Sequence, residues 1–295
     1  MNPLIEIDGA ALEYRLIGHG EQTVVILTGM GCSFEEWVPL ATTHQDAYRF
    51  LLFHRPGFGT SERGNKSRRT ETVIQECIAL LDALRITSPI LLVGHSYGGL
   101  CAQHLAKRYP GQIRGLVLVD STSHDYWRLD EVDTPTLDAL GSDEAWRNQC
   151  RTYGQMHEND LKQTIQAEWS VGQERLSDEI KGRLLAFYRN PLMYRTMLEE
   201  DANWADDARL IKRLGQIVCP LVVIGRDSEA MIRQGVQDGV PAPEMRAFEE
   251  MWHRLVREQV ALSDSAVYVD AVSSGHHVHL DRPDVVIEAL AHLTP

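Results

Sequence analysis

A serine flanked by glycines lies between an apolar run and a helical pattern. The sequence from Gly94 to Gly98 reads G-x-S-x-G around Ser96, and it directly follows the apolar run Ile90–Val93. A serine at a strand–turn–helix junction is held in a strained conformation with its hydroxyl exposed above the strand end. The N–H groups that open the next helix can stabilise a developing oxyanion. The bare pattern is weak, but its position predicts that Ser96 is a nucleophile.

The elements that must position this serine are short apolar runs separated by helical patterns. The runs nearest Ser96 are almost continuous in Val, Ile, Leu and Phe, which is typical of parallel strands buried on both faces. Helical spacing follows at Thr72–Leu84 and Gly98–Tyr109. This alternation predicts an α/β fold with a mostly parallel, doubly wound sheet. The expected strands are Ile5–Asp8, Ala11–Leu16, Thr23–Thr28, Tyr48–Phe53, Ile90–Val93, Leu116–Val119, Leu221–Ile224 and Ala266–Val269.

The alternation of strand and helix patterns stops in the stretch 121–214. It shows helical and loop patterns without a convincing strand, and it is rich in Trp, Tyr and Phe. We expect a core domain made of residues 1–120 and 215–295, with 121–214 inserted as a helical cap over the active site. Most of the cap aromatics should form the cap's own core, because buried aromatics are usually structural. Further helices are expected near Pro243–Leu262 and Asp284–Leu293.

Four sequence blocks together resemble the α/β-hydrolase superfamily over essentially the whole chain. The resemblance implies the α/β-hydrolase fold, a serine nucleophile, a histidine base and an acid in the order Ser, acid, His. Serine at the nucleophile position argues against the dehalogenases and epoxide hydrolases of this superfamily, which use aspartate there. The blocks are Leu27-Thr-Gly-Met-Gly31, His54-Arg-Pro-Gly-Phe-Gly-Thr-Ser61, Val93-Gly-His-Ser-Tyr-Gly-Gly99 and Ser274-Gly-His-His-Val-His-Leu-Asp-Arg-Pro283.

The base is assigned by position among twelve histidines. A serine hydroxyl needs a histidine within hydrogen-bond reach to become nucleophilic. His276 follows a Ser-Gly pair after the last expected strand, where the family's catalytic histidine falls. Its neighbours His277, His279 and Asp281 could instead suggest metal ligation. No second ligand cluster accompanies them, so we expect neither a metal nor an organic cofactor.

The resemblance also implies the oxyanion donors. Family members use the amide after the nucleophile, here Tyr97, and a second amide from an earlier His-Gly-x loop, here Met30. Thr28 stands where the family has that histidine, but a backbone donor tolerates the change. His54 replaces an aspartate often seen before Arg-Pro-Gly, and we expect it to be structural.

Three carboxylates compete for the acid that orients the histidine. Asp120 ends the strand that follows the Ser96 helix, a position used by some branches of the family. Asp227 and Glu229 follow the strand Leu221–Ile224, where most members keep the acid, but Gly225-Arg-Asp-Ser-Glu229 does not fit the usual Gly-x-x-Asp. We favour Asp120, with Asp227 and Glu229 left open.

The amino-acid composition and net charge restrict the kinds of binding partner that are expected. The chain has 295 residues, 43% apolar, with a formal charge of −13. Such a charge disfavours nucleic acid and anionic membrane surfaces as partners. Five scattered cysteines without a C-x-x-C pair are typical of reduced thiols, and no signal peptide or membrane span is apparent, so we expect a cytoplasmic protein.

The function expected from these features is hydrolysis of an ester-type bond, in a carboxylic ester or a lactone, through an acyl-enzyme on Ser96. The substrate is expected to be a small molecule with an apolar or aromatic group, since aromatics are abundant in the cap. The same residues would serve an amidase or peptidase, a C–C bond hydrolase or a cofactor-free haloperoxidase. A receptor-like ligand-binding module with little turnover is the alternative outside enzymes.

Overall fold

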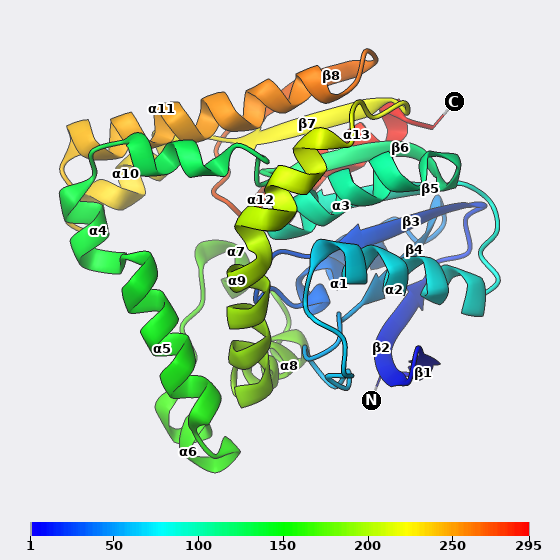
Figure 1. Ribbon diagram of the computed structural model, residues 1–295, viewed down its shortest axis with the longest axis horizontal. Helices are drawn as coiled ribbons and strands as arrows, with labels where there is room; N and C mark the ends of the chain where they lie inside the picture. The colour runs from blue at the N-terminus through cyan, green and yellow to red at the C-terminus, as the bar shows by residue number, and fades with distance from the viewer. Residues whose placement is uncertain (1, 295) are drawn as a thin grey trace.

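An eight-stranded sheet forms the centre of the structure, a computed structural model that describes residues 2–294 (Figure 1). Its strands lie in the order β1-β2-β4-β3-β5-β6-β7-β8. The first two pairings, β1 with β2 and β2 with β4, are antiparallel, and all others are parallel. The strands are β1 (Leu4–Ile7), β2 (Ala10–Ile17), β3 (Gln22–Leu27), β4 (Tyr48–Phe53), β5 (Ile90–His95), β6 (Ile113–Val119), β7 (Leu221–Arg226) and β8 (Ala266–Ala271).

The central strands are buried on both faces, which explains their continuous apolar sequence. In β5, Leu92 packs on one side of the sheet, whereas Leu91 and Val93 pack on the other. Successive side chains of a strand point to opposite faces, so both faces need apolar residues. The predicted doubly wound sheet is confirmed.

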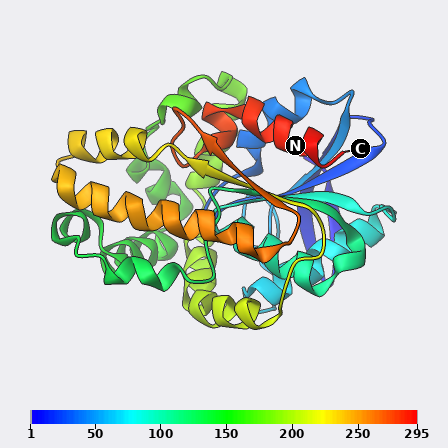
Figure 2. The same ribbon diagram turned by 90° about the horizontal axis from the view of Figure 1, so that it is seen from above.

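Helices cover each face of the sheet. One face packs against α2 (Thr70–Ala83), α3 (Tyr97–Arg108) and parts of α9 and α11. The other packs against α1 (Val38–Thr43) and α13 (Pro283–His292), as Figure 2 shows from above. The remaining helices of this part are α10 (Ser228–Gln237), α11 (Ala242–Glu258) and the short α12 (Val278–Asp281), with 3₁₀ helices at Phe34–Trp37, Pro110–Gln112 and Gln259–Leu262.

Between β6 and β7 the described chain contains only helices and loops. These helices extend to one side of the sheet in Figure 1 and have a small apolar core of their own, which includes Phe187 and Tyr194. The longest of them, α9, returns the chain toward the sheet. The segment comprises a 3₁₀ helix at Tyr126–Glu131, α4 (Pro135–Gly141), α5 (Asp143–Gln155), α6 (Glu158–Thr164), α7 (Val171–Glu174), α8 (Asp178–Tyr188) and α9 (Pro191–Arg213).

None of the helices within residues 2–294 combines the length and the apolar character needed to cross a lipid bilayer.

Candidate active site

Ser96 lies at the turn between β5 and α3, in a strained backbone conformation. Its φ of 53° and ψ of −125° are unusual for a residue with a side chain. The glycines around it are required by packing. A Cβ on Gly94 would lie 2.6 Å from the Ala102 Cβ, and one on Gly98 would lie 2.1 Å from the Leu27 carbonyl oxygen. Because α3 sits this close to the sheet, the turn is sharp and Ser96 occupies its apex.

Two backbone amides beside Ser96 are free to act as donors. The Tyr97 amide opens α3, where N–H groups have no partner within the helix. The Met30 amide lies in the loop after β3, and a Cβ on Gly29 would be 3.1 Å from the Ser96 Cβ. Within residues 2–294, neither amide donates a hydrogen bond to another protein group. The two amides predicted from the sequence to be donors thus belong to the residue after Ser96 and to the residue after Gly29, whose backbone approaches Ser96.

A buried ion pair holds the Met30 loop in place. The Arg55 guanidinium donates to the carbonyl oxygens of Thr28 at 2.8 Å and Gly29 at 3.3 Å. The same guanidinium binds both carboxylate oxygens of Glu200 on α9, at 2.7 and 3.0 Å. The buried Arg55–Glu200 ion pair thus connects α9 to the loop that carries Met30.

The structure brings His276 and Asp120 together. The Nδ1 atom of His276 lies 2.5 Å from Oδ2 of Asp120, whose side chain is completely buried at the end of β6. Asp120 has a positive φ of 38°, which turns the chain sharply as it leaves the strand. The other carboxylate oxygen accepts a hydrogen bond of 2.8 Å from the indole Nε1 of Trp252 on α11.

The surroundings of this pair favour an ionised acid and a neutral base. Burial alone would raise the pKa of Asp120, but Arg226 and the hydrogen bond with His276 lower it below its ordinary value. Burial lowers the pKa of His276, and the neighbouring Asp120 offsets this only in part. An imidazole that is neutral at neutral pH can accept a proton from a hydroxyl.

The two competing carboxylates lie elsewhere. Asp227 caps α10 by accepting from the amides of Glu229 and Ala230, and its other oxygen accepts from the Ser273 amide. Glu229 is exposed and pairs with Arg246. Neither side chain is hydrogen-bonded to His276 in the described chain.

His95, which directly precedes Ser96 in the sequence, contacts His276. The His95 Nε2 lies 3.0 Å from the His276 carbonyl oxygen, and the two rings have centroids 4.7 Å apart. Within residues 2–294, the Ser96 hydroxyl does not form a hydrogen bond with the His276 ring. Such bonds are often long without substrate and shorten in the reactive complex.

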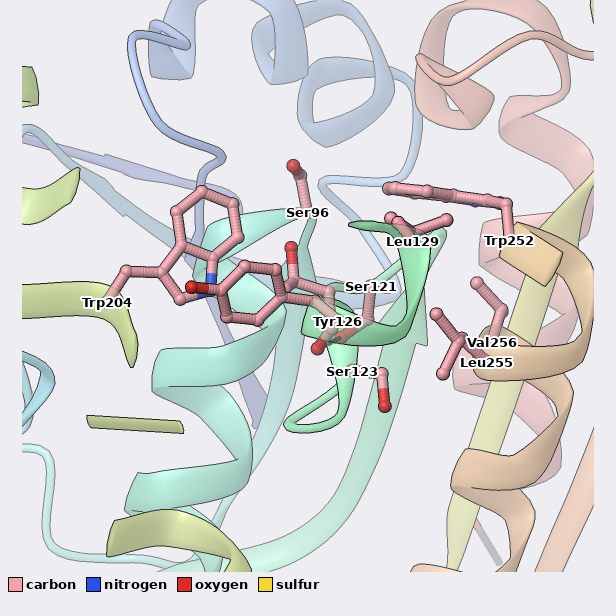
Figure 3. A pocket seen from close by; sticks show the side chains of 10 residues that line it. Ser96, Ser121, Ser123, Tyr126, Leu129, Trp204, Trp252, Leu255 and Val256 are labelled. Carbon is pink, nitrogen blue, oxygen red and sulfur yellow. Dashed lines mark hydrogen bonds between the residues drawn. The ribbon is translucent and has the colours of Figure 1, made fainter. Parts of the chain in front are cut away.

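A largely apolar pocket of about 100 Å³ opens beside Ser96 (Figure 3). Trp204 and Tyr126, both from the helical segment, lie on one side of it, and Trp252 and Leu129 lie on the other. Trp204 and Tyr126 belong to the aromatic residues in which the stretch 121–214 is rich. The floor carries small hydroxyl side chains, with Ser121, Thr122 and Ser123 following Asp120. An apolar or aromatic group of modest size fits these walls.

Three residues that support Asp120 were missed by sequence reasoning. Arg226, at the end of β7, binds Asp120 at 3.3 Å and Glu249 at 2.5 Å, and its guanidinium stacks 4.2 Å from the Trp252 ring. Glu249 and Trp252 are three residues apart on α11 and therefore share one face of that helix. The one signal in the sequence was an arginine at the end of an apolar strand.

His54 also has a clear structural role. Its Nδ1 lies 2.7 Å from Glu13, and its Nε2 lies 2.9 Å from the hydroxyl of Ser33. Because the Phe34 amide also donates to Nε2, this nitrogen is an acceptor and Nδ1 carries the proton. All three side chains are buried. The expectation of a structural role at the strand end agrees with these contacts.

Comparison with known proteins gives a family match over most of the chain. The sequence model of the "Alpha/beta hydrolase family" matches residues 24–289. The chain is 23% identical to the "Uncharacterized protein YqjL" of Bacillus subtilis (strain 168), over 97% of this chain and 89% of that protein.

Relatives with a stated activity match over shorter stretches. The "Pimeloyl-[acyl-carrier protein] methyl ester esterase" of Sodalis glossinidius is 35% identical over 38% of this chain and 41% of its own length. Among solved structures, the enol-lactonase from Burkholderia xenovorans LB400 superposes with a TM-score of 0.66 and 19% identity, covering 99% of both chains. At this identity the superposition shows a shared fold.

Proposed function

The chain belongs to the alpha/beta hydrolase family, and from this premise we propose that it is a serine hydrolase that cleaves ester-type bonds. The substrates would be carboxylic esters or lactones of small molecules, and the reaction would pass through an acyl-enzyme on Ser96. Ser96 is the nucleophile of this proposal, His276 the base and Asp120 the acid.

The observation that carries the proposal is the position of Ser96. Its strained turn lies beside two free backbone donors and the mouth of an apolar pocket. A serine with a purely structural role would need neither the strained backbone angles nor the neighbouring donors and pocket that Ser96 has. The His276–Asp120 hydrogen bond in the adjacent loop supports the same assignment.

In the proposed acylation step, His276 accepts the proton of the Ser96 hydroxyl while the oxygen attacks the substrate carbonyl carbon. The carbonyl oxygen gains negative charge and accepts hydrogen bonds from the amides of Met30 and Tyr97, each worth about 3 kcal/mol in the transition state. Asp120 keeps the His276 ring in the required tautomer and stabilises its protonated form. His276 then gives its proton to the leaving alcohol oxygen as the C–O bond breaks.

Deacylation repeats these roles with water. His276 accepts a proton from the water molecule, whose oxygen attacks the acyl carbon, and then returns the proton to Ser96 as the acid product leaves. The balance is one ester or lactone and one water giving one acid and one alcohol group. This chemistry uses only the chain's own residues and water.

The helical segment 121–214 serves in this proposal as a lid on the core made of residues 1–120 and 215–295. Trp204 and Tyr126 of the lid bound the pocket beside Ser96, so the lid would select the acyl part of the substrate. A pocket of about 100 Å³ favours a short or flat apolar acyl group over a long chain.

The test is intact-protein mass spectrometry after exposure to a fluorophosphonate probe. We expect one adduct per chain on the wild type, none on Ser96→Ala and much slower labelling of His276→Ala. Ser123→Ala is the matched control, because it removes a hydroxyl from the same pocket and should leave labelling intact.

Labelling of Ser96→Ala at the wild-type rate would contradict the assignment of the nucleophile. A folded wild type that forms no adduct would also contradict it and would favour a ligand-binding module without turnover. Steady release of p-nitrophenol from a p-nitrophenyl ester over many turnovers would then separate an esterase from a protein that is merely acylated.

A further inference from the structure

Next to the proposed catalytic histidine lies a second group of polar side chains that the reaction does not use. Glu36 lies in the 3₁₀ helix Phe34–Trp37, whereas His277 and His279 directly follow His276. The side chains of Glu36 and His279 are completely buried, and that of His277 is 31% exposed. We call these three residues the Glu36 cluster. The sequence suggested His277 and His279 as possible ligands, but we expected no metal because Glu36, some 240 residues away, could not be recognised as their partner.

Three atoms of this cluster face one another without a hydrogen bond. They are Oε2 of Glu36, Nδ1 of His277 and Nε2 of His279, and each is buried without a partner. A buried polar atom left unpaired costs about 1–3 kcal/mol. Three such atoms in one place therefore indicate a missing ligand rather than a chance defect.

The cluster is held in this orientation by its surroundings. The second oxygen of Glu36, Oε1, accepts hydrogen bonds from the Gln173 amide at 2.6 Å and the Tyr188 hydroxyl at 3.4 Å, both from the helical segment. The Trp37 ring stacks on His279 with centroids 4.0 Å apart and planes within 6°. These contacts fix the Glu36 carboxylate and the plane of the His279 ring, whose other nitrogen, Nδ1, has no hydrogen-bond partner among the described residues.

The distances fit a cation better than a shared proton. Oε2 of Glu36 lies 3.5 Å from both His277 Nδ1 and His279 Nε2. This is longer than an ordinary N–H···O hydrogen bond of about 2.7–3.2 Å. It is close to the separation of about 3.3 Å between two ligand atoms that each lie about 2.0–2.1 Å from a tetrahedral zinc ion. All three atoms lie within 4.8 Å of one another, and binding to one ion would draw them to within about 4.2 Å.

We propose that Glu36, His277 and His279 bind one divalent transition-metal cation of the zinc type. Two imidazole nitrogens and one carboxylate suit Zn²⁺, Co²⁺ or Ni²⁺, whereas Mg²⁺ and Ca²⁺ prefer oxygen ligands only. A tetrahedral ion with three protein ligands keeps one position for water.

This cation would be structural in its effect. It would tie the loop after β3 to the chain that directly follows His276, and Glu36 would tie both to the helical segment through Gln173 and Tyr188. The ion takes no part in the proposed reaction at Ser96. Its binding is therefore independent of the proposed function.

A groove at the surface adjoins the cluster. Glu36 and His279 form part of the wall of a groove of about 810 Å³ that runs between α1, α7 and α13. The other walls include Gly172, Leu176 and Leu280. A hydrated cation can enter this groove, although the ligand side chains themselves are covered.

The test is metal binding to the full-length protein after dialysis against a chelator. We expect isothermal titration with Zn²⁺ to show one site per chain and a raised melting temperature. Glu36→Gln and His279→Ala should each weaken that site at least about tenfold, the range seen for metal sites that lose part of their support. The matched control is His19→Ala, which removes an exposed histidine 3.4 Å from Asp46 and should leave binding unchanged.

Two results of the Zn²⁺ titration would overturn the proposal. One is a folded wild type without saturable Zn²⁺ binding, which would mean that the cluster is a histidine–carboxylate pair sharing a proton. The other is equal Zn²⁺ binding by wild type and both variants, which would place the ion elsewhere. If a variant fails to fold, Co²⁺ added to the wild type decides the matter through the visible absorption of tetrahedral cobalt, whose absence would also overturn the proposal.

Discussion

Among the three candidate acids, Asp120 is the one whose carboxylate contacts His276, whereas Asp227 accepts from backbone amides and Glu229 pairs with Arg246. His276, Arg226 and Trp252 all bind its two carboxylate oxygens. A carboxylate fixed in this way selects the His276 tautomer with a proton on Nδ1, which leaves Nε2 free to accept a proton.

At this position we expect Asp120→Asn to lower kcat by about 10⁴-fold, because the amide favours the wrong tautomer of His276. KM should change little, since Asp120 does not line the pocket. Steady-state kinetics on a p-nitrophenyl ester would measure both constants.

Glu229→Gln provides the comparison, because Glu229 is exposed and pairs only with Arg246. Its kcat should match that of the wild type. A large loss in Glu229→Gln together with an active Asp120→Asn would reverse the assignment of the acid.

At the scale of elements, α9 is joined to the core by the buried Arg55–Glu200 pair. Glu200→Gln removes the negative charge and leaves the Arg55 guanidinium buried without its counter-ion. Breaking such a pair costs about 3–5 kcal/mol. We expect a loss of that size in the free energy of unfolding, measured by urea denaturation.

The control lies one residue away on the same helix. Glu199 pairs with Arg63 at the surface, with its side chain 43% exposed. Glu199→Gln should change the free energy of unfolding by less than about 1 kcal/mol, as surface ion pairs do. Equal losses for the two variants would show that Arg55 does not anchor α9.

A second prediction concerns the pocket wall supplied by α9. Trp204→Ala should enlarge the pocket beside Ser96 and raise kcat/KM for a hexanoyl ester relative to an acetyl ester. An extra methylene in an apolar pocket is worth about 1–3 kcal/mol, so the ratio should rise at least about tenfold. Rates on the p-nitrophenyl esters of the two acids would measure it, and an unchanged ratio would place the acyl group elsewhere.

The elements themselves were largely predictable. All eight strands appear where they were predicted, with ends shifted by up to three residues. The central strands gave the strongest pattern, because they are buried on both faces. The short helices α1 and α10 were not predicted. The contacts of α11 with Asp120 were also beyond prediction, since they depend on how Trp252 and Glu249 fold back onto β6 and β7.

At the scale of the whole molecule, Glu13 contributes to the stability of the fold at low pH. Burial raises the pKa of Glu13, but His54 and the Thr60 amide lower it more, to about 2 from an ordinary value of 4.5. A carboxyl group with a lowered pKa stabilises the fold above its unfolded pKa and loses that contribution as pH falls through its folded pKa. The contribution is on the order of 3 kcal/mol.

We therefore expect the wild type to lose stability relative to Glu13→Gln between about pH 4.5 and pH 2. Urea denaturation of both proteins at several pH values would measure the difference between their free energies of unfolding. The contributions of the other carboxyl groups are the same in both proteins and cancel in this difference. A difference that stays constant with pH would contradict the low pKa of Glu13.

The contacts of Glu13 also bear on how catalytic sites are recognised from coordinates. Ser33, His54 and Glu13 reproduce the side-chain connectivity of a Ser–His–carboxylate triad, with distances of 2.9 and 2.7 Å. A template search that compares only side-chain atoms would score this group above Ser96, whose hydroxyl is not bonded to His276. Yet Ser33 is sealed from solvent and its backbone is ordinary, with φ of −84° and ψ of 144°. A template that also includes the backbone angles of the serine and its exposure to solvent would distinguish Ser96 from Ser33.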